Sequence, residues 1–467
     1  MEFDRPNPAA NVMLFKKELW IREYSTRMQR FLSGEKLAPV RIDAELHRRC
    51  NLGCVHCIRR SSDHDMTEES KRIEVPERRW VEIARESGRM GTRAWNIAGI
   101  GEPMCKPELT LKVMKTIKEH KMFGELTTNG TLWDDSQIRT AVRIGWDSIG
   151  FSVDAADAGT HDRIRNKTGV FEKVTGTIRR FDLYRKEIGT DKPGLTVNMV
   201  LNALNYRMLP DMIRMTARLG ADAIFVEPMI VHSDKGEEIR IRGEALRELP
   251  GIIDKAQNLA KELNILTYIT CLDGDDEKKE FNSELVEKTS DIREVIINAA
   301  QEKKEKAVAE KLRDLFSRKE EYKPRISDDA KEILEIPCYY PWFYLMINAD
   351  GSVVHCGECR DFRDNIRESS LEQIWFGEHL QELRASYRNR ELPQYCRRCR
   401  PNVIGDMKLV RKSIKEYTDV EHMQRKLVSL FKDNILLKEG LYYAKTGKEP
   451  WVKERRALLE KARVFRF

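Results

Sequence analysis

Short apolar runs alternate with longer amphipathic stretches over the first half of the chain. The runs have the length of buried strands and cover residues 40–46, 94–100, 124–128, 148–153, 195–201 and 223–226. Segments with a helical period separate them, among them residues 79–87, 110–120, 173–187 and 209–219. Because parallel strands need long crossover connections, this alternation predicts a parallel β/α array. In a curved or barrel form, the loops after the strands would share one rim, where catalytic groups gather.

The pattern changes after residue 228, and five segments are expected in all. Residues 246–264 have a helical period, and residues 265–269 form a further short apolar run. The expected segments are a helical lead-in (1–40), a partial barrel (41–270), a charged helical insertion rich in Lys and Glu (271–335), a cysteine-rich module (336–403) and a basic helical tail (404–467).

Composition narrows the class of protein. Hydrophobic residues make up 41% of the chain and charged residues 34%, as in a soluble globular protein. No run approaches the roughly 20 apolar residues that cross a bilayer. The first residues also lack the basic start and apolar run of a signal peptide, so we expect a cytoplasmic protein.

The formal net charge of +7 resides in the tail. Residues 404–467 contain 16 Lys and Arg against nine Asp and Glu, which accounts for the whole excess. The balanced remainder argues against a nucleic-acid-binding body. The tail has a helical period and is expected to pack on its own domain, with contact to anionic lipid as the alternative.

Three cysteines follow the first apolar run at the spacing C-x3-C-x2-C: Cys50, Cys54 and Cys57. Disulfides are not expected in a reducing compartment, and such close spacing indicates metal. Three thiolates on a short loop can bind three irons of a 4Fe-4S cluster and leave the fourth iron open. Zinc is the alternative, but a structural zinc site requires four ligands, and His56 lies where its ring would have difficulty turning inward.

The run CNLGCVHC, residues 50–57, resembles the signature of the radical S-adenosylmethionine (SAM) superfamily. The resemblance implies a partial (β/α)6 barrel whose cysteine loop holds a catalytic 4Fe-4S cluster. It also implies that the open iron binds SAM, that one electron releases a 5′-deoxyadenosyl radical, and that this radical abstracts hydrogen from the substrate. A reduced flavodoxin or ferredoxin-type protein is the implied electron donor.

The ends of the next two apolar runs support this resemblance. Residues 97–103, IAGIGEP, resemble the Gly-Gly-Glu-Pro turn of the superfamily, with Ile100 in place of the first glycine. Gly101 permits close approach of the backbone, and Glu102 can accept a hydrogen bond from an ammonium group. Asn129 lies in a Thr-Asn-Gly sequence. The resemblance implies that all three residues contribute to the SAM site.

Two further residues complete the implied SAM site. Ser152 and Arg165 match a Ser-x-Asp…His-Asp-x-x-Arg pattern, which implies contacts to the ribose or the carboxylate of SAM. A guanidinium suits a carboxylate because it can bond both oxygens. Taken alone, Arg165 would be read as a solvated helix residue. Glu227 closes the last run at the same rim and is a candidate substrate ligand, with a salt bridge to a neighbouring helix as the alternative.

A second group of cysteines lies near the C-terminus. Cys338, Cys356, Cys396 and Cys399 could saturate a 4Fe-4S cluster or bind zinc. Asp350-Gly351 predicts a hairpin between residues 343–348 and 352–355. The segment resembles the SPASM/Twitch extension of radical SAM enzymes, in its short form with one auxiliary cluster.

Three cysteines remain without an assigned role. Cys359 is an alternative ligand, a redox group or a bystander. Cys105 and Cys271 match no motif and are expected in the interior.

Together, the two resemblances imply an enzyme that uses SAM and two 4Fe-4S clusters. A fully ligated auxiliary cluster favours outer-sphere electron transfer, and so a net oxidation such as dehydrogenation of a sugar or aminocyclitol. Modification of a peptide, by crosslinking or epimerisation, is the second hypothesis. An iron–sulfur or zinc regulatory protein that binds nucleic acid is a third, but it leaves Glu102, Ser152 and Arg165 without a role.

Overall fold

The computed structural model describes residues 35–58, 74–231, 233–269, 338–357 and 361–389, together with Tyr24, Arg27, Arg30, Phe31, Cys359, Pro393, Cys396 and Met407. All of these belong to one compact unit, Met1–Leu409; the other unit is Val410–Phe467. The predictions for the insertion, for Cys271 and Cys399, and for the tail other than Met407 lie outside the described residues.

A ten-stranded sheet forms the framework, in the order β10-β9-β8-β1-β2-β3-β4-β5-β6-β7. Its central strands are β1 (Arg41–Ala44), β2 (Ala94–Ile97), β3 (Phe123–Thr128), β4 (Ser148–Ser152), β5 (Gly194–Leu201), β6 (Ala223–Pro228) and β7 (Leu266–Ile269). Neighbours from β1 to β7 are all parallel. The parallel β/α array predicted from the apolar runs is therefore confirmed.

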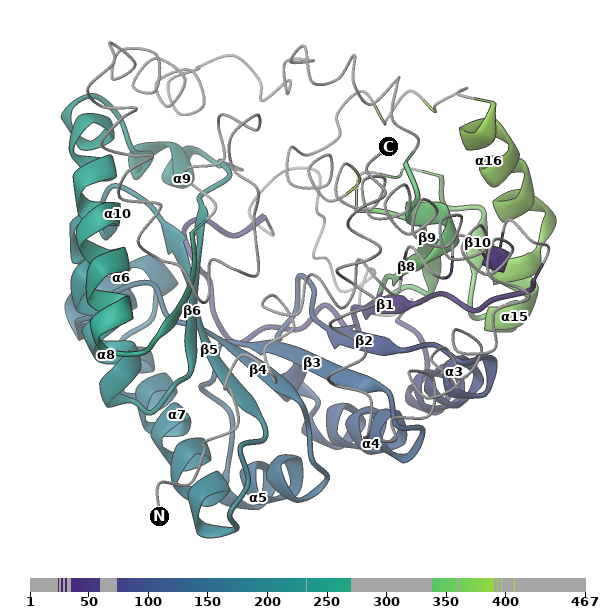
Figure 1. Ribbon diagram of the computed structural model, residues 1–467, viewed down its shortest axis with the longest axis horizontal. Coiled ribbons are helices and arrows are strands. Elements are labelled where there is room, and N and C mark those ends of the chain that lie inside the picture. The colour runs from purple at the N-terminus through teal and green to yellow at the C-terminus, as the bar shows by residue number, and fades with distance from the viewer. Residues whose placement is uncertain are drawn as a thin grey trace, which may run out of the picture. The chain divides into compact units, whose positions relative to one another are not determined.

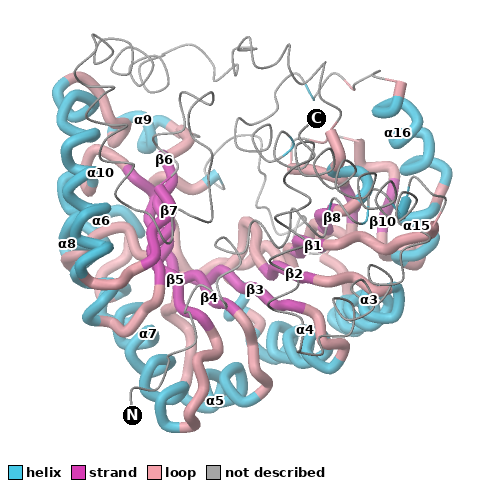
Figure 2. Tube along the Cα trace, in the orientation of Figure 1, coloured by secondary structure: helices cyan, strands magenta, loops and turns pink. Residues whose placement is uncertain are grey.

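Helices connect these strands. They are α3 (Glu77–Met90), α4 (Pro107–Glu119), α5 (Asp135–Arg143), α6 (Ala158–Arg165), α7 (Val170–Glu187), α8 (Leu209–Arg218), α9 (Asp234–Glu238) and α10 (Glu244–Glu262), with the 3₁₀ helices η4 (Pro103–Cys105) and η5 (Tyr206–Met208). Figures 1 and 2 show α3, α4, α5, α7 and α8 along the convex side of the curved sheet. Among the described residues, no helix has the length and apolarity needed to cross a bilayer.

The two faces of the sheet differ in polarity. One face packs on the helices and is apolar: Phe151 of β4, for example, is fully buried with its ring centroid 5.6 Å from that of Phe181 in α7. Alternate residues of a strand point to opposite faces. The concave face therefore carries the intervening residues, which are mainly polar and only partly buried: Arg41, Asp43, Asn96, Glu125, Thr127, Ser152 and Asn198.

The C-terminal module continues this sheet. β8 (Tyr344–Ile347) pairs in parallel with β1, β9 (Ser352–Val354) pairs antiparallel with β8, and β10 (Asp364–Asn365) pairs antiparallel with β9. The predicted hairpin is confirmed, and Gly351 at its turn has φ 89°, a left-handed conformation that favours glycine. The pairing of β8 with β1 was not predicted.

Helical segments complete the module. They are η7 (Tyr340–Trp342), α15 (Leu371–Phe376) and α16 (Glu378–Arg388). Part of the expected lead-in packs here, because the ring of Tyr24 stacks on Phe343 with centroids 4.2 Å apart.

Candidate functional site

The first three cysteines lie on a loop that follows β1. Cys54 is buried, and Cys50 and Cys57 are half-buried. The backbone N–H of Cys57 donates to the carbonyl of Cys54 at 3.3 Å, which closes a turn. The N–H of Val55 donates to the carbonyl of Ile164 in α6 at 2.9 Å, so the loop is attached to the end of that helix.

Arg165, on the last turn of α6, lies between this loop and a buried carboxylate. Its Nε is 2.8 Å from Oδ2 of Asp154, and its Nη1 donates to Sγ of Cys54 at 3.7 Å. Burial alone would lower the pKa of Arg165, but Asp154 and Cys54 raise it above its ordinary value. A fixed positive charge therefore stands beside the sulfur of Cys54, one of the three predicted iron ligands.

Asp154 makes further hydrogen bonds through its side chain and its backbone. Its Oδ1 accepts from the N–H of Val200 at 3.0 Å, and its own N–H donates to Nδ1 of His161 at 3.1 Å. Burial would raise the pKa of Asp154, but the nearby Arg165 and two histidines lower it overall. Burial, aided by Arg165, lowers the pKa of His161 to about 4. His161 is thus neutral and accepts at Nδ1, which fixes the backbone next to the Asp154–Arg165 pair.

Glu102 lies at the predicted rim, but its carboxylate is engaged inside the protein. Oε1 accepts from the hydroxyl of Thr128 at 2.6 Å and from the N–H of Met104 at 3.0 Å, and Oε2 accepts from the N–H of Asn129 at 2.6 Å. Burial raises the pKa of Glu102 despite these bonds. The side chain thus joins the ends of β2 and β3, whereas the sequence suggested a direct bond to an ammonium group.

Gly101 permits close approach, as predicted, but the neighbouring group is the cysteine loop. A Cβ at Gly101 would lie 2.2 Å from the carbonyl oxygen of His47. The next residue, Glu102, donates its N–H to the carbonyl of Arg49 at 2.7 Å. The Gly-Glu-Pro turn therefore packs directly on the backbone that leads into Cys50.

Asn129 binds the cysteine loop through its side chain. Its Nδ2 donates to Oδ1 of Asn51 at 2.9 Å, and its Oδ1 accepts from the hydroxyl of Thr131 at 2.7 Å. Nδ2 of Asn51 donates to Oγ1 of Thr131 at 2.9 Å, which closes a ring of three side chains. Sequence reasoning did not single out Asn51 or Thr131, although both lie within or beside the motifs it used.

The remaining candidates of the barrel lie on the concave face. Ser152 is half-buried and stands opposite Asn198 of β5. Gly150 leaves room for Asn198, since a Cβ there would lie 2.4 Å from its Nδ2. Glu227 is exposed near the end of β6, opposite Val200. Because the strands are parallel, Ser152 and Glu227 end at the same rim as the cysteine loop, on strands further along the sheet.

In the second module, Cys356 and Cys359 follow the hairpin, and Cys396 contacts Tyr387 of α16. Cys356 follows β9 and accepts the N–H of Cys359 at its carbonyl, at 3.3 Å. Cys359 is 2% exposed, and its Sγ accepts from the N–H of Asp361 at 3.4 Å. Burial is the main cause that raises the pKa of the Cys396 thiol to about 11. The nearby Cys359 raises this pKa further, whereas the hydrogen bond with Tyr387 lowers it. Cys359, which the sequence left without a role, is thus close to a predicted ligand.

Both groups of cysteines have the donor chemistry of iron–sulfur ligands, whereas the described residues show no group of three or more such side chains placed to hold a metal ion. Thiolates are the ligands of such clusters, and the first loop offers three of them beside a guanidinium. In the second module, Cys338, Cys356, Cys359 and Cys396 are described, and Cys338, Cys356 and Cys396 are half-buried. Cys105 also is half-buried, at the end of η4, rather than fully interior as expected.

Comparison with protein families gives two matches. The model of the Radical SAM superfamily matches residues 45–216, and the model of SPASM, an iron–sulfur cluster-binding domain, matches residues 338–400.

Similar curated proteins match over part of the chain. The cofactor-modifying protein of tungsten-containing aldehyde ferredoxin oxidoreductase from Pyrococcus furiosus is 28% identical over 188 residues, 40% of this chain and 50% of that protein. A PqqA peptide cyclase from Granulibacter bethesdensis is 25% identical and covers 50% of this chain and 59% of its own. Pre-heme d1 synthase from Dinoroseobacter shibae is 26% identical, over 42% of this chain and 44% of its own. The chain thus spans about half the length of these relatives.

One solved structure supports the fold. Streptococcus suis SuiB bound to S-adenosylmethionine aligns with a TM-score of 0.51 at 14% identity, over 83% of this chain and 75% of SuiB. At this identity the likeness concerns the fold.

Proposed function

We propose that this chain, which contains a Radical SAM domain and a C-terminal SPASM iron–sulfur module, is an enzyme that abstracts hydrogen from a substrate carbon and completes a net oxidation there. When bound, a 4Fe-4S cluster and SAM supply the 5′-deoxyadenosyl radical, with a reduced flavodoxin or ferredoxin as electron donor.

The protein's part is to hold and orient these groups. Cys50, Cys54 and Cys57 bind the first cluster. Arg165 approaches the same loop from α6 and binds the carboxylate of SAM, with Asp154 as its anchor. Gly101, Glu102 and Asn129 keep the loop in place through the backbone and side-chain contacts described above. Ser152, on the concave face, is the residue that would contact the ribose of SAM.

The observation that best supports a net oxidation is the pairing of β8 with β1. The cysteine loop follows β1, and the hairpin that leads to Cys356 is the next structure in the same sheet. In a net oxidation, the substrate loses a hydrogen atom from carbon to the radical and then one electron to an acceptor, and one proton passes to solvent. Cys338, Cys356, Cys396 and Cys399 would hold a cluster with no open iron, and such a group would be able to accept that electron.

The concave face supports a small polar substrate, such as a sugar or aminocyclitol. Nε of Arg41 is 2.5 Å from Oδ1 of Asp43, and Nη2 of Arg41 is 3.4 Å from Oε2 of Glu125. Asn198 and Ser152 continue this polar surface. An apolar substrate would desolvate these groups without replacing their hydrogen bonds, which is unfavourable. Glu227, exposed at the rim, is a further candidate contact.

A peptide is the second candidate substrate, and the relatives favour it. Several of the similar curated proteins are PqqA peptide cyclases. The same balance of one hydrogen atom, one electron and one proton would form a crosslink or an unsaturated residue in a peptide.

The test is a substrate screen with anaerobically loaded protein, SAM and a reductant. Deuterated pools of polar metabolites and of peptides are offered, and deuterium transfer into 5′-deoxyadenosine identifies the pool that contains the substrate. The product should lack two hydrogen atoms. Deuterium transfer with a product in which another hydrogen atom has replaced the abstracted one, as in an epimerisation, would contradict net oxidation.

A further inference from the structure

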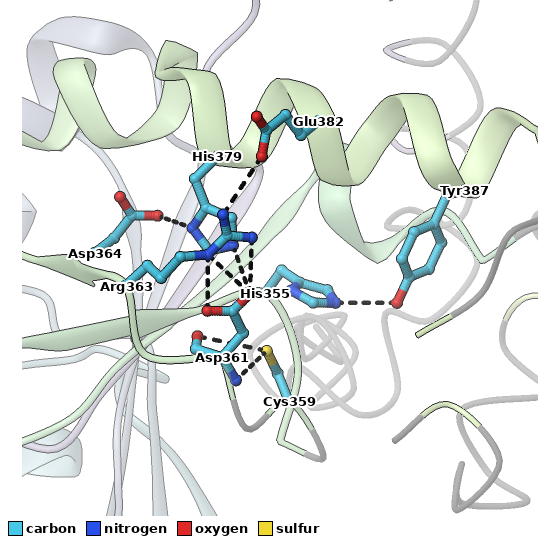
Figure 3. Close-up of polar contacts among 8 residues, drawn as sticks. All are labelled: His355, Cys359, Asp361, Arg363, Asp364, His379, Glu382 and Tyr387. Atoms are coloured by element: carbon cyan, nitrogen blue, oxygen red, sulfur yellow. Dashed lines mark hydrogen bonds and ion pairs between the residues drawn. The ribbon is translucent and has the colours of Figure 1, made fainter. Parts of the chain in front are cut away.

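A buried chain of contacts connects α16 to the second group of cysteines. Nε2 of His355 lies 3.1 Å from the hydroxyl of Tyr387, and the two rings meet edge to face with centroids 5.7 Å apart (Figure 3). The same hydroxyl lies 2.9 Å from Sγ of Cys396. His355 is 2% exposed and Tyr387 is 1% exposed, so water does not compete for these bonds.

The chain of contacts joins two predicted cluster ligands. His355 directly precedes Cys356, and Tyr387 lies near the end of α16. Tyr387 therefore reaches from the helix to Cys396, and His355 connects it to the strand end that carries Cys356.

Iron binding would fix the direction of both hydrogen bonds. A cysteine sulfur bound to iron is a thiolate, which accepts hydrogen bonds and cannot donate them. The hydroxyl of Tyr387 must then donate to Cys396. Its oxygen is left to accept, so His355 must carry its proton on Nε2 and donate to Tyr387.

We propose that Tyr387 is a positioning residue of the auxiliary cluster that raises its reduction potential, and that His355 orients the Tyr387 hydroxyl. Reduction adds negative charge to a cluster and its sulfurs, so a hydrogen bond donated to a ligand sulfur stabilises the reduced form more than the oxidised form. The low dielectric of a buried site strengthens this effect. The inference rests on the proposed binding of a cluster by Cys396 and on its role as electron acceptor.

His379, the histidine of α16, makes different contacts. His379 lies 2.6 Å from Oδ2 of Asp364 through Nδ1 and 3.1 Å from Oδ2 of Asp361 through Nε2, and Arg363 also contacts Asp361 (Figure 3). Both nitrogens of His379 are therefore engaged with carboxylates. Tyr387, in contrast, contacts a predicted ligand sulfur through its hydroxyl.

The test is a potentiometric titration of the full, anaerobically loaded chain, followed by electron paramagnetic resonance. SAM is added so that the signal of the first cluster is distinguished from that of the auxiliary cluster. Tyr387→Phe keeps the ring and removes the donor. At a fixed potential, the ratio of reduced to oxidised auxiliary cluster should fall about tenfold, a shift of about 60 mV for a one-electron couple.

A second variant and a control make the result decisive. His355→Gln keeps an N–H donor but changes its geometry, so a smaller fall in the same direction is expected. Tyr184→Phe, on α7, makes the same change away from the module and should leave the potential unchanged. The first cluster's potential should be unaffected in all three.

Several outcomes would overturn the proposal. One is an unchanged potential in Tyr387→Phe at full iron content; another is an equal shift in Tyr184→Phe. If Tyr387→Phe fails to bind iron, an unchanged or raised potential in His355→Gln has the same meaning. A lowered potential with no loss of substrate oxidation would instead support the tuning and refute the acceptor role in the proposed function.

Discussion

Arg165 offers a way to separate a cofactor contact from structural support. The structure gives it two partners, the buried Asp154 and Cys54. If Arg165 binds the carboxylate of SAM, Arg165→Ala removes a charge-assisted bond worth about 1.5–3 kcal/mol. The dissociation constant of SAM should then rise about 10- to 150-fold. Arg165→Lys should recover only part of this, because an ammonium lacks the planar fork.

A substitution of Asp154 extends the experiment to a double-mutant cycle with Arg165. The side chain of Asp154 is fully buried and that of Arg165 is 8% exposed, so breaking this pair should also lower the free energy of unfolding by about 3–5 kcal/mol. Asp154→Asn keeps the Arg165 charge but loosens its position, so SAM binding should weaken less than in Arg165→Ala. Because Asp154 acts through Arg165, the double variant should bind SAM no more weakly than Arg165→Ala alone.

The assay is equilibrium dialysis of labelled SAM against anaerobically loaded protein, with urea unfolding measured in parallel. The matched control is a surface pair, Arg180 and Asp135, whose Nη1 and Oδ1 are 2.7 Å apart at 37% and 59% exposure. Arg180→Ala should cost at most about 1 kcal/mol of stability and leave SAM binding unchanged. Unchanged SAM binding in Arg165→Ala, or additive effects in the double variant, would refute the reasoning.

Three further predictions follow from individual contacts. Glu102→Gln leaves one internal N–H donor without an acceptor and should lower the free energy of unfolding by about 1–3 kcal/mol. Glu119→Gln makes the same change at an exposed position and should leave the free energy of unfolding unchanged. Urea unfolding measures both variants. Folding lowers the pKa of His161 to about 4, so as the pH falls the imidazole of the unfolded chain is protonated before that of the folded chain. The free energy of unfolding should therefore fall by up to about 1.4 kcal/mol per pH unit from about pH 6.5 down to about pH 4. His161→Asn should remove that contribution, and a pH dependence of stability equal to that of the wild type would contradict the prediction. Cys359→Ala should keep about eight irons per chain and Cys396→Ala about four, and iron analysis showing the reverse would exchange their roles.

The sequence was sufficient for the elements whose residues repeat with a clear period. Strands β1 to β6 and the short β7 were found because each is an apolar run, and their bounds agree within a few residues. The short helices α5 and α6 were not named. A signal existed for α5, because Asp134 and Gln137 form a capping box whose two residue types are visible in the sequence.

Contacts between distant segments could not be predicted. Arg41 stands opposite Tyr344, and nothing in the local pattern of either strand indicates that pairing. The motifs likewise located Glu102 and Asn129 but not their partners, because a motif fixes a position and tertiary packing decides what a side chain bonds. The same reason explains why Asp154 and Tyr387 became prominent only in three dimensions.

The most direct test of the account is SAM cleavage by the full chain. Anaerobically loaded protein, SAM and a low-potential reductant should yield 5′-deoxyadenosine. The variant with Cys50, Cys54 and Cys57 all replaced by Ala should stay folded, keep about half of the iron and yield none. Absence of 5′-deoxyadenosine from fully loaded wild-type protein, or its continued formation by the triple variant, would contradict the central claim.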